Sequence, residues 1–454
     1  MSLMVREKKF YKTFASMTGV IAMQNLITFA VNLADNVMIG GYSQTALSGV
    51  AIVNQIQFLL QMLMLGTGSA IGVLGAQYWG KKELKPIQKA TSIGMLLGVI
   101  LSGLMMLAVF FFPQQAMGLL TNEQAVIEEG SKYLVIVCFS YVLFAVSNNL
   151  LSALRSVETV KIGFVVNLIA LVVNITLNYG LIYGHFGMPE MGVEGAAIAT
   201  LTARVVEFLV VLIYVLFVDQ KICWRPKDIL HIDLVMFRDY IKVGMPLILA
   251  NAIWGIAMSA QTAILGRMGE DTIAANSIAT TIFQVVSVVT YAASTASGVI
   301  IGITVGEGDI SRVKAYTKTM QILFLGIGVV TGLTLYSCTD LIISLYDVTP
   351  AAAELSRQFI TVLSVTVVGT SYQCSCLTGI VTGGGDTKFV LINDLIHQWL
   401  IVIPSAFLSA FVFHGPLWVT FACLKSDQIL KCFVAVVKIN RYRWIRVLTR
   451  ENTN

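Results

Sequence analysis

Long apolar segments, separated only by short polar stretches, follow one another along the whole chain of 454 residues. A helix rises 1.5 Å per residue, so an apolar run of about 20 residues is long enough to cross the hydrocarbon of a membrane. The pattern therefore predicts a series of membrane-spanning helices. Twelve are predicted, over residues 14–40, 46–75, 91–112, 133–155, 162–185, 193–218, 240–266, 273–303, 316–338, 357–381, 389–412 and 416–437.

The composition indicates the same fold class. Hydrophobic residues make up 56% of the chain and charged residues 12%, with a mean hydropathy of +0.80, whereas a soluble domain has about 25% charged residues. In lipid, a backbone satisfies its own hydrogen bonds only as a helix or a closed barrel, and the alternating pattern of barrel strands is absent. We therefore expect an all-α polytopic membrane protein. The net charge of +5 is spread over loops, so we expect no nucleic-acid partner.

The loops between the predicted helices alternate in charge. Basic residues gather at the N-terminus and in every second loop, and the loops between these are richer in acidic residues. The positive-inside rule places basic loops in the cytoplasm. We therefore expect both termini in the cytoplasm and a multi-pass protein of the plasma (inner) membrane. The basic tail carries Lys438, Arg441, Arg443, Arg446 and Arg450.

An internal repeat divides the chain into two halves. A shift of 226 residues lays "SAIGVLGAQYWG" (69–80) on "TASGVIIGITVG" (295–306), with Gly80 on Gly306. Two parallel bundles of six helices follow, related by a pseudo-twofold axis along the membrane normal, which is typical of alternating-access transporters. We expect an N-terminal bundle over residues 1–220, a cytoplasmic linker over 221–239 and a C-terminal bundle with its basic tail over 240–454.

One carboxylate, Asp35, is the only charged residue in the 68 positions between Lys12 and Lys81. A charged side chain costs a few kcal/mol at the centre of a membrane helix, so it faces a cavity or a partner and marks a functional site. The repeat position of Asp35 holds the neutral Gln261, so only the first half carries a titratable group there.

Counting residues from the outer helix ends places several amides and hydroxyls at the depth of Asp35. Oxygen ligands of this kind suit a proton or a hard monovalent cation, although such residues also hold membrane helices together. The predicted ion-coupling residues are Asp35, Asn174, Asn178, Thr200 and Thr202, and the candidates for a substrate cavity are Asn32, Asn54, Gln57, Gln61, Asn148 and Gln261.

A second polar cluster lies on the last two predicted helices. Asp427 and Lys431 have the i, i+4 spacing of a helical ion pair. Asp394 and Lys431 are at similar distances from the cytoplasmic ends of their helices, so they could pair across helices. We interpret these contacts as structural or gating. The cluster comprises Asp394, His397, Lys425, Asp427 and Lys431.

Other classes of function find no support in the motifs. "VTGGGDTK" (381–388) lacks the spacing of a phosphate-binding loop, and no ATPase domain is encoded. The core holds no Ser/His, paired-Asp or HExxH constellation, so we expect no enzyme. The seven cysteines do not have the spacing of metal ligands. We therefore expect no metal site other than one for Na⁺ at Asp35. We expect no cofactor other than transported H⁺ or Na⁺, no ATPase subunit, and a monomer.

Several stretches closely resemble the multidrug and toxic compound extrusion (MATE) family. They are "NLADNVMIGGYSQTALSGVAIVNQI", "LLSALRSVETVK", "NLIALVVNITLNYGLIYG", "GVEGAAIAT" and "TGIVTGGGDTK". The resemblance implies two six-helix bundles that export mostly cationic organic compounds in exchange for protons or sodium ions. It also implies that Asp35 and Asn174 match the family's coupling aspartate and asparagine.

Within the family, the resemblance is better to the DinF-like branch. Another branch carries acids in its seventh and tenth helices, where this chain has Gln261 and "SYQCSCLTGIVTG". Some DinF-like members have an aspartate at the position of Asn178, and its replacement by an amide weakens the case for a sodium site. The expected partners are small organic substrates and membrane lipids. The alternatives are a lipid-linked precursor flippase of the wider superfamily and a membrane sensor or channel without coupled transport.

Overall fold

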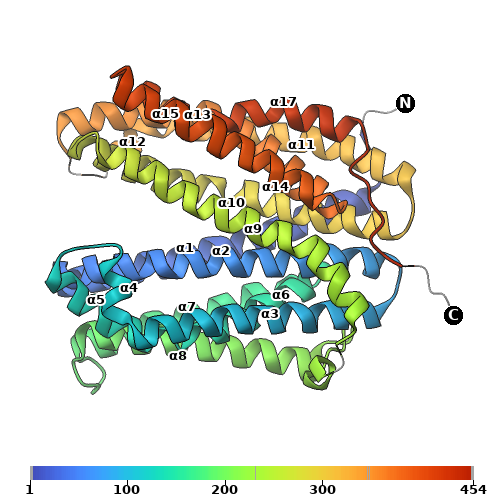
Figure 1. Cartoon of the computed structure of the whole chain (residues 1–454), viewed down its shortest axis with the longest axis horizontal. Helices are drawn as coiled ribbons and strands as arrows, with labels where there is room; N and C mark the ends of the chain where they lie inside the picture. The colour runs from blue at the N-terminus through green and yellow to red at the C-terminus, as the bar shows by residue number, and fades with distance from the viewer. Residues whose placement is uncertain (1–3, 231, 345, 347, 451–454) are drawn as a thin grey trace. The chain divides into compact units, whose positions relative to one another are not determined.

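Every regular element in the described part of the chain is a helix (Figure 1). The computed structural model describes residues 4–230, 232–344, 346 and 348–450. Helices are expected for an apolar chain in lipid, because each helix satisfies its own backbone hydrogen bonds. The prediction of an all-α fold is therefore confirmed.

The first half of the chain folds into eight α-helices. The last of them continues into a π-helical turn, and a short 3₁₀ helix follows in the linker. They are α1 (Lys8–Tyr42), α2 (Gln44–Gly80), α3 (Leu84–Phe111), α4 (Pro113–Gly118), α5 (Gln124–Val137), α6 (Ser140–Ser156), α7 (Lys161–Tyr183), α8 (Gly192–Ile213), η1 (Tyr214–Val218) and η2 (Pro226–Leu230).

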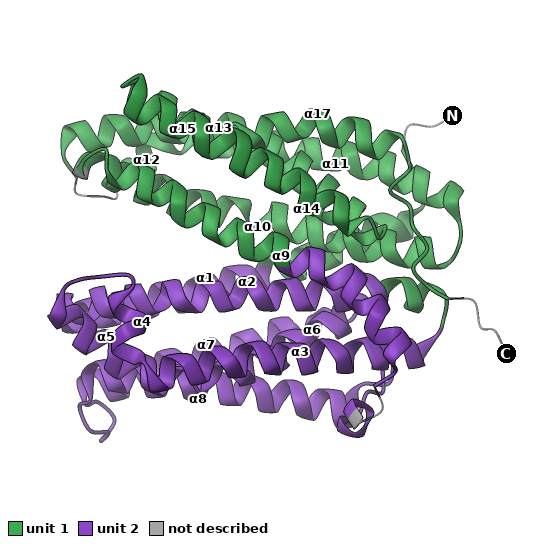
Figure 2. Cartoon of the chain, in the orientation of Figure 1, with its two compact units in different colours: residues 1–22, 76–82, 249–454 green, residues 23–75, 83–248 purple. Residues whose placement is uncertain are grey.

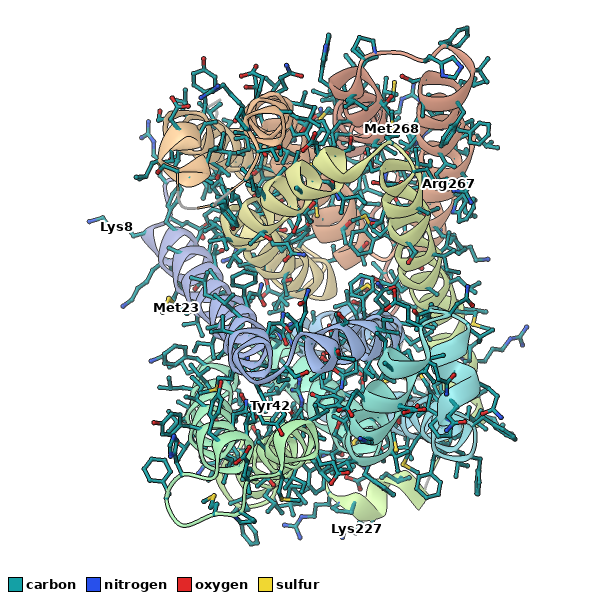
Figure 3. All side chains as sticks on the ribbon, turned by 90° about the vertical axis from the view of Figure 1, so that its left-hand side faces the viewer. Lys8, Met23, Tyr42, Lys227, Arg267 and Met268 are labelled. Carbon is teal, nitrogen blue, oxygen red and sulfur yellow. The ribbon has the colours of Figure 1, made fainter. Side chains whose placement is uncertain are left out.

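The second half begins with α-helices, and over residues 350–412 it alternates α-helices with π-helical segments. Its first two long helices meet at a tight turn that contains Arg267 and Met268 (Figure 3). The elements are α9 (Leu234–Gly266), α10 (Glu270–Gly306), α11 (Ile310–Ser337), α12 (Thr339–Ile343), α13 (Pro350–Cys374), η3 (Ser375–Val381), α14 (Thr387–Leu395), η4 (Ile396–Val402), α15 (Ile403–Phe407), η5 (Leu408–Val412), α16 (Leu417–Leu424) and α17 (Asp427–Asn440).

All twelve predicted segments are helical, but two of them are broken. By length and hydropathy, ten described helices could cross a membrane, and α5 with α6 forms an eleventh span that bends by 52°. The helix predicted over 416–437 is divided at Lys425 and Ser426 into α16 and α17. Each of the two pieces is too short to cross a membrane alone, and charged residues such as Lys425 and Asp427 stand at the break.

The described chain forms two compact units (Figure 2). Unit 1 contains residues 1–22, 76–82 and 249–454, and unit 2 contains residues 23–75 and 83–248. Each unit has its own apolar core, around Met64 and Tyr141 in unit 2 and around Phe359 and Phe421 in unit 1. In unit 2, the axes of α3, α7 and α8 lie roughly parallel to one another (Figure 1). The division at 220 and 240 proposed from the sequence stays a prediction.

The predicted linker is packed rather than free. Trp224 is buried, and its indole donates to the Ser92 hydroxyl on α3 at 2.9 Å. Gln88 on the same helix donates to the carbonyl of Ile222 at 2.8 Å. These contacts hold the chain between the halves against the end of α3.

Two glycines related by the repeat make reciprocal backbone contacts in unit 1. A β-carbon on Gly80 would overlap the carbonyl oxygen of Ile303, and one on Gly306 would overlap that of Gln77. Both pairs obey the shift of 226 residues, since Gln77 lies on Ile303 and Gly80 on Gly306. The ends of α2 and α10 therefore cross at a distance that only glycine permits, as expected for small residues at membrane helix interfaces.

Residues 441–450, which we name the C-terminal segment, fold back onto unit 1. Gln77, fully buried, donates to the carbonyl of Arg446 at 3.2 Å and accepts from the backbone N–H of Leu448 at 2.8 Å. The Arg446 N–H donates to the carbonyl of Gly384 at 2.8 Å. Trp444 is also fully buried, so the segment is part of the packed structure.

Candidate functional site

A line of hydrogen bonds joins α1 to α7 within unit 2. Near one end, Gln24 donates to the carbonyl of Val160 at 2.9 Å. Near the other, the Tyr183 hydroxyl donates to the carbonyl of Met38 at 2.6 Å. Polar groups in an apolar phase need partners, so these bonds set the register of the two helices.

Asp35 is part of this line. It lies seven residues before the end of α1, and Asn178 lies five residues before the end of α7. The Asn178 amide nitrogen donates to the Asp35 carboxylate and also to the Asn174 amide oxygen, the latter at 3.3 Å. Asp35 is 9% exposed, and the two asparagines are buried. The structure therefore brings together three of the five predicted ion-coupling residues.

Two polar atoms at this site have no hydrogen-bond partner among the described residues. They are the amide oxygen of Asn178 and the amide nitrogen of Asn174. An unpaired buried polar atom costs about 1–3 kcal/mol. The pair thus offers one free acceptor and one free donor beside a carboxylate, which is the arrangement expected of a site that takes up a further ligand.

The predicted threonines on α8 bind other groups. The Thr202 hydroxyl donates to the carbonyl of Ile198 at 2.8 Å, one turn back on its own helix. Thr200 forms a hydrogen bond of 3.3 Å with the Tyr133 hydroxyl of α5. Neither threonine has a hydrogen bond to Asp35 among the described contacts.

Tyr133 and Arg204 extend the site, and we did not predict either as a member. Both interact electrostatically with Asp35. Arg204 also forms an ion pair of 2.6 Å with Glu207 and lies 5.0 Å from the centre of the Phe144 ring. The signal for Arg204 was present in the sequence as an i, i+3 pair on an apolar helix. Tyr133 gave no such signal, because a tyrosine is common in membrane helices.

The predicted cavity residues are spread over both units. Asn148 donates to the carbonyl of Met64 at 2.9 Å, so its amide holds α6 against α2. Asn32 is exposed on α1. Three half-buried amides share one face of α2, with spacings of three and four residues: Asn54, Gln57 and Gln61.

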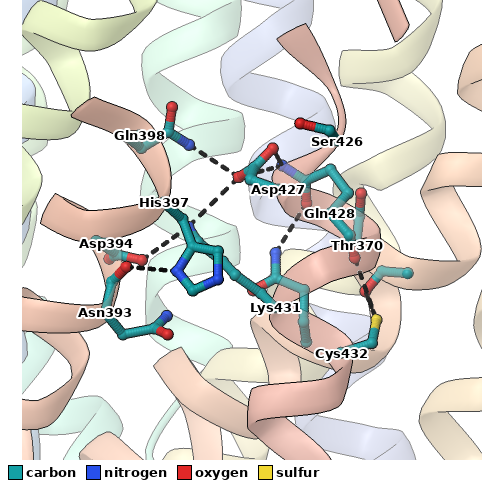
Figure 4. A network of polar contacts seen from close by, with 12 residues as sticks. Thr370, Asn393, Asp394, His397, Gln398, Ser426, Asp427, Gln428, Lys431 and Cys432 are labelled. Atoms are coloured by element: carbon teal, nitrogen blue, oxygen red, sulfur yellow. Dashed lines mark hydrogen bonds and ion pairs between the residues drawn. The ribbon is translucent and has the colours of Figure 1, made fainter. Parts of the chain in front are cut away.

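Gln261 belongs to a polar network in unit 1 (Figure 4). It donates to the Gln398 amide oxygen at 3.2 Å, and the Gln398 nitrogen donates to Asp427 at 2.8 Å. Lys431 lies 2.8 Å from Asp394 on α14 and 3.4 Å from Asp427. Four of the five members of the predicted second cluster are thereby brought close together. His397 is buried beside this network and bonds the carbonyl of Asn393 at 2.8 Å.

Lys425 is the member that the network does not include. It lies at the break between α16 and α17, with its ammonium 5.7 Å from the centre of the Phe421 ring. No ion pair of Lys425 is present among the described contacts. Its contribution to the cluster is therefore its charge, which acts on the nearby Asp427.

Comparison with known proteins places the chain in a family. The model of the MatE family matches it twice, over residues 21–180 and 246–408. A probable multidrug resistance protein NorM of Listeria monocytogenes is 24% identical over 437 residues, which are 95% of this chain and 94% of that protein. A protein of the same name from Oceanobacillus iheyensis is 27% identical over 405 residues, covering 86% and 88% of the two chains.

Solved structures share the fold. The Vibrio cholerae MATE transporter VcmN in its bent form has a TM-score of 0.85 at 17% identity and covers 97% of each chain. A MOP superfamily transporter from Pyrococcus furiosus has a TM-score of 0.84 at 18% identity, covering 94% of this chain and 96% of that one. The double match of the family model also agrees with the internal repeat. The chain is an integral membrane protein, and it belongs to the MatE family.

Proposed function

We propose that this chain is a secondary antiporter that exports organic, mostly cationic compounds in exchange for a proton bound at Asp35. Relatives named as probable multidrug resistance proteins support the class of substrate. The observation that carries the coupling role is the buried Asp35 carboxylate, which accepts a hydrogen bond from Asn178 beside two unpaired amide atoms. A proton at this site cancels a charge that is costly to bury.

The amide of Asn178 suits both charge states of Asp35. As a carboxylate, Asp35 accepts a hydrogen bond from the Asn178 nitrogen. As a neutral acid, it has an O–H to donate, and the Asn178 oxygen is an acceptor without a partner among the described residues. Proton binding therefore changes how α1 is held to α7, and this change would bias the protein between its outward-open and inward-open states.

Sodium is the competing ion for the same site. The oxygens of Asp35, Asn174 and Asn178 are hard ligands that suit a monovalent cation. We favour the proton because only one of these residues is charged. We also propose that the chain belongs to the DinF-like branch. The reason is that the acid lies in the first half, at Asp35, whereas the repeat position in the second half holds the neutral Gln261.

A lipid-linked precursor flippase is the less supported function. Recognition of a pyrophosphate calls for free basic groups. Arg204 is paired with Glu207 at 2.6 Å, and Lys431 contacts two carboxylates. Both cations, the half-buried Arg204 and the buried Lys431, are thus already paired with carboxylates of the chain.

The distribution of basic loops supports the plasma (inner) membrane as the location, with both termini in the cytoplasm. In this orientation Asp35 lies toward the outer end of its helix, because α1 begins at the cytoplasmic N-terminus and ends seven residues after Asp35. Protons from the outer side would then have the shorter path to the carboxylate.

Efflux of a fluorescent cation from proteoliposomes, with pH and sodium gradients imposed separately, tests the proposal. We expect a pH gradient alone to drive efflux, and Asp35→Asn to abolish it without loss of folded protein. Efflux driven only by sodium would assign the site to Na⁺. Gradient-driven efflux by Asp35→Asn would contradict the coupling role, and a lack of uphill transport by the wild type would favour a sensor or channel.

A further inference from the structure

Two carboxylates share one ion-paired ammonium in the unit 1 network. Lys431 is the one ammonium that forms ion pairs there, and it lies between the carboxylates of Asp394 and Asp427 (Figure 4). The side chains of Lys431 and Asp427 are 5% and 2% exposed. The two carboxylates thus compete for the one ammonium that pairs with both, and the ammonium of Lys425, which forms no ion pair among the described residues, acts on Asp427.

The two carboxylates differ in how they are held. Asp427 accepts hydrogen bonds from Gln398 at 2.8 Å and from Gln428 at 3.0 Å, in addition to its contact with Lys431. It is also the first residue of α17, where the helix dipole favours negative charge. Asp427 is therefore stabilised as an anion.

Asp394 has much less support for its charge. Its described partner is Lys431, at 2.8 Å, and its side chain is 25% exposed. It is thus the carboxylate that a proton can reach, and it loses only one contact when it is neutralised. Of the two acids, Asp394 therefore has fewer contacts that stabilise its negative charge.

The helices around this pair depart from regular geometry. Gln398 lies in the π-helical segment η4, which directly follows α14 and Asp394. Lys431 lies on α17, just after the break at Lys425 and Ser426. Single π-helical turns inside α-helices occur frequently at functional sites. Helices with such irregularities shift at a smaller cost than continuous ones.

We propose that Asp394 is a second proton-binding site, which controls whether α14 and η4 are tied to α17. When one proton binds Asp394, its ion pair with Lys431 ends, and Lys431 remains paired with Asp427. The charge of the three residues then changes from −1 to zero. Through Gln398, the change reaches Gln261, the residue at the repeat position of Asp35.

The ligand is a proton rather than a metal ion. The Lys431 ammonium already lies within 3.4 Å of both carboxylates. A metal cation bound between them would meet this positive charge at close range. The other titratable groups that face the pair come from α10, α13, η4 and the break before α17: Tyr291, Cys374, His397 and Lys425.

Hydrogen exchange of the full-length protein in nanodiscs tests the site without any transport. Between about pH 7 and about pH 4, a range that approaches the ordinary pKa of an aspartate, about 3.9, we expect residues 387–402 to lose protection beyond the intrinsic effect of pH. Asp394→Asn should show the low-pH protection at every pH. His397→Gln and Asp340→Asn, the latter an exposed acid on α12, should behave like the wild type. A pH response that survives in Asp394→Asn, or one that disappears in His397→Gln, would overturn the proposal.

Transport gives a second readout, which rests on the proposed function. Exchange of a monovalent cation for one proton at Asp35 is electroneutral, whereas a second proton at Asp394 makes each cycle move net charge. Efflux of a monovalent fluorescent cation should therefore respond to an imposed membrane potential in the wild type and lose this response in Asp394→Asn. Equal responses in both would contradict a role in coupling. Asp35→Asn separates the two proposals, because loss of pH-driven efflux there concerns Asp35 alone.

Discussion

Asn178 donates a hydrogen bond to Asp35 with its amide nitrogen, while its amide oxygen has no partner among the described residues. An amide supplies a donor and an acceptor on two separate atoms of one side chain. A leucine would have a similar size and neither group, and an alanine would also leave a cavity. Under the proposed function, Asn178 is therefore the residue that links the charge of Asp35 to α7.

We expect Asn178→Leu to lower proton-driven efflux by about tenfold or more. Hydrogen bonds to charged groups contribute about 1.5–3 kcal/mol, and the variant removes the donor to the Asp35 carboxylate. The initial rate of efflux from proteoliposomes, at matched protein content, gives the measurement. Asn167→Ala is a matched control, because Asn167 lies on the same helix and donates to Thr28 at 3.3 Å, away from Asp35. Equal losses of efflux in both variants would indicate that these asparagines only hold α1 and α7 together.

Two buried tyrosines allow a second comparison. The Tyr133 hydroxyl pairs with Thr200 at 3.3 Å, whereas the Tyr141 hydroxyl has no partner among the described residues. We expect Tyr133→Phe to slow efflux severalfold, because it removes a polar group that interacts with Asp35. Tyr141→Phe should leave efflux unchanged. It should raise the free energy of unfolding by about 1 kcal/mol, since it removes an unpaired buried hydroxyl. A loss of stability in Tyr141→Phe would mean that this hydroxyl has an unrecognised partner.

Hydrophobic pattern alone was sufficient to predict the fold. Long apolar runs have few alternatives to helices in lipid, and each of the twelve predicted segments is helical. The bend between α5 and α6 was not predicted. No proline or glycine stands at Cys138 and Phe139, so the sequence offers no local signal for a change of direction there.

Counting residues along helices predicted depth but not direction. Asp35 and Asn178 meet because they share both depth and facing sides. Thr200 has a suitable depth, yet its hydroxyl is held by Tyr133. Tyr133 itself belongs to a bent pair of helices, so its depth could not be counted from a continuous segment. The rotation of each helix about its own axis is set by packing, which a single sequence does not report.

The reciprocal glycine contacts in unit 1 predict that substitution of Gly80 and of Gly306, which are far apart in the sequence, lowers stability equally. Gly80→Ala and Gly306→Ala should each lower the free energy of unfolding by about 1–3 kcal/mol, because a β-carbon would overlap backbone atoms that have no rotamer to relieve it. Thermal unfolding of the purified protein measures this. Gly326→Ala on α11 serves as control, since nothing lies within 4 Å of its β-carbon position. It should be neutral or stabilising by about 0.5–1 kcal/mol. Normal stability of Gly80→Ala and Gly306→Ala would refute the close crossing.

One buried amide, Gln77, forms two of the hydrogen bonds that hold the C-terminal segment, so its replacement should loosen the segment. Gln77 donates to the carbonyl of Arg446 at 3.2 Å and accepts from the N–H of Leu448 at 2.8 Å. Gln77→Leu removes both bonds, each worth about 0.5–1.5 kcal/mol, while Trp444 and the ion pair of Arg446 with Asp386 at 2.9 Å remain. We expect trypsin to cleave at Arg443 and Arg446 about tenfold faster in the variant, because proteolysis follows the population of the open form. The control variant Gln115→Leu, at an exposed position of α4, should be cleaved by trypsin at the wild-type rate. Unchanged cleavage in Gln77→Leu would show that Trp444 and Asp386 hold the segment without the amide.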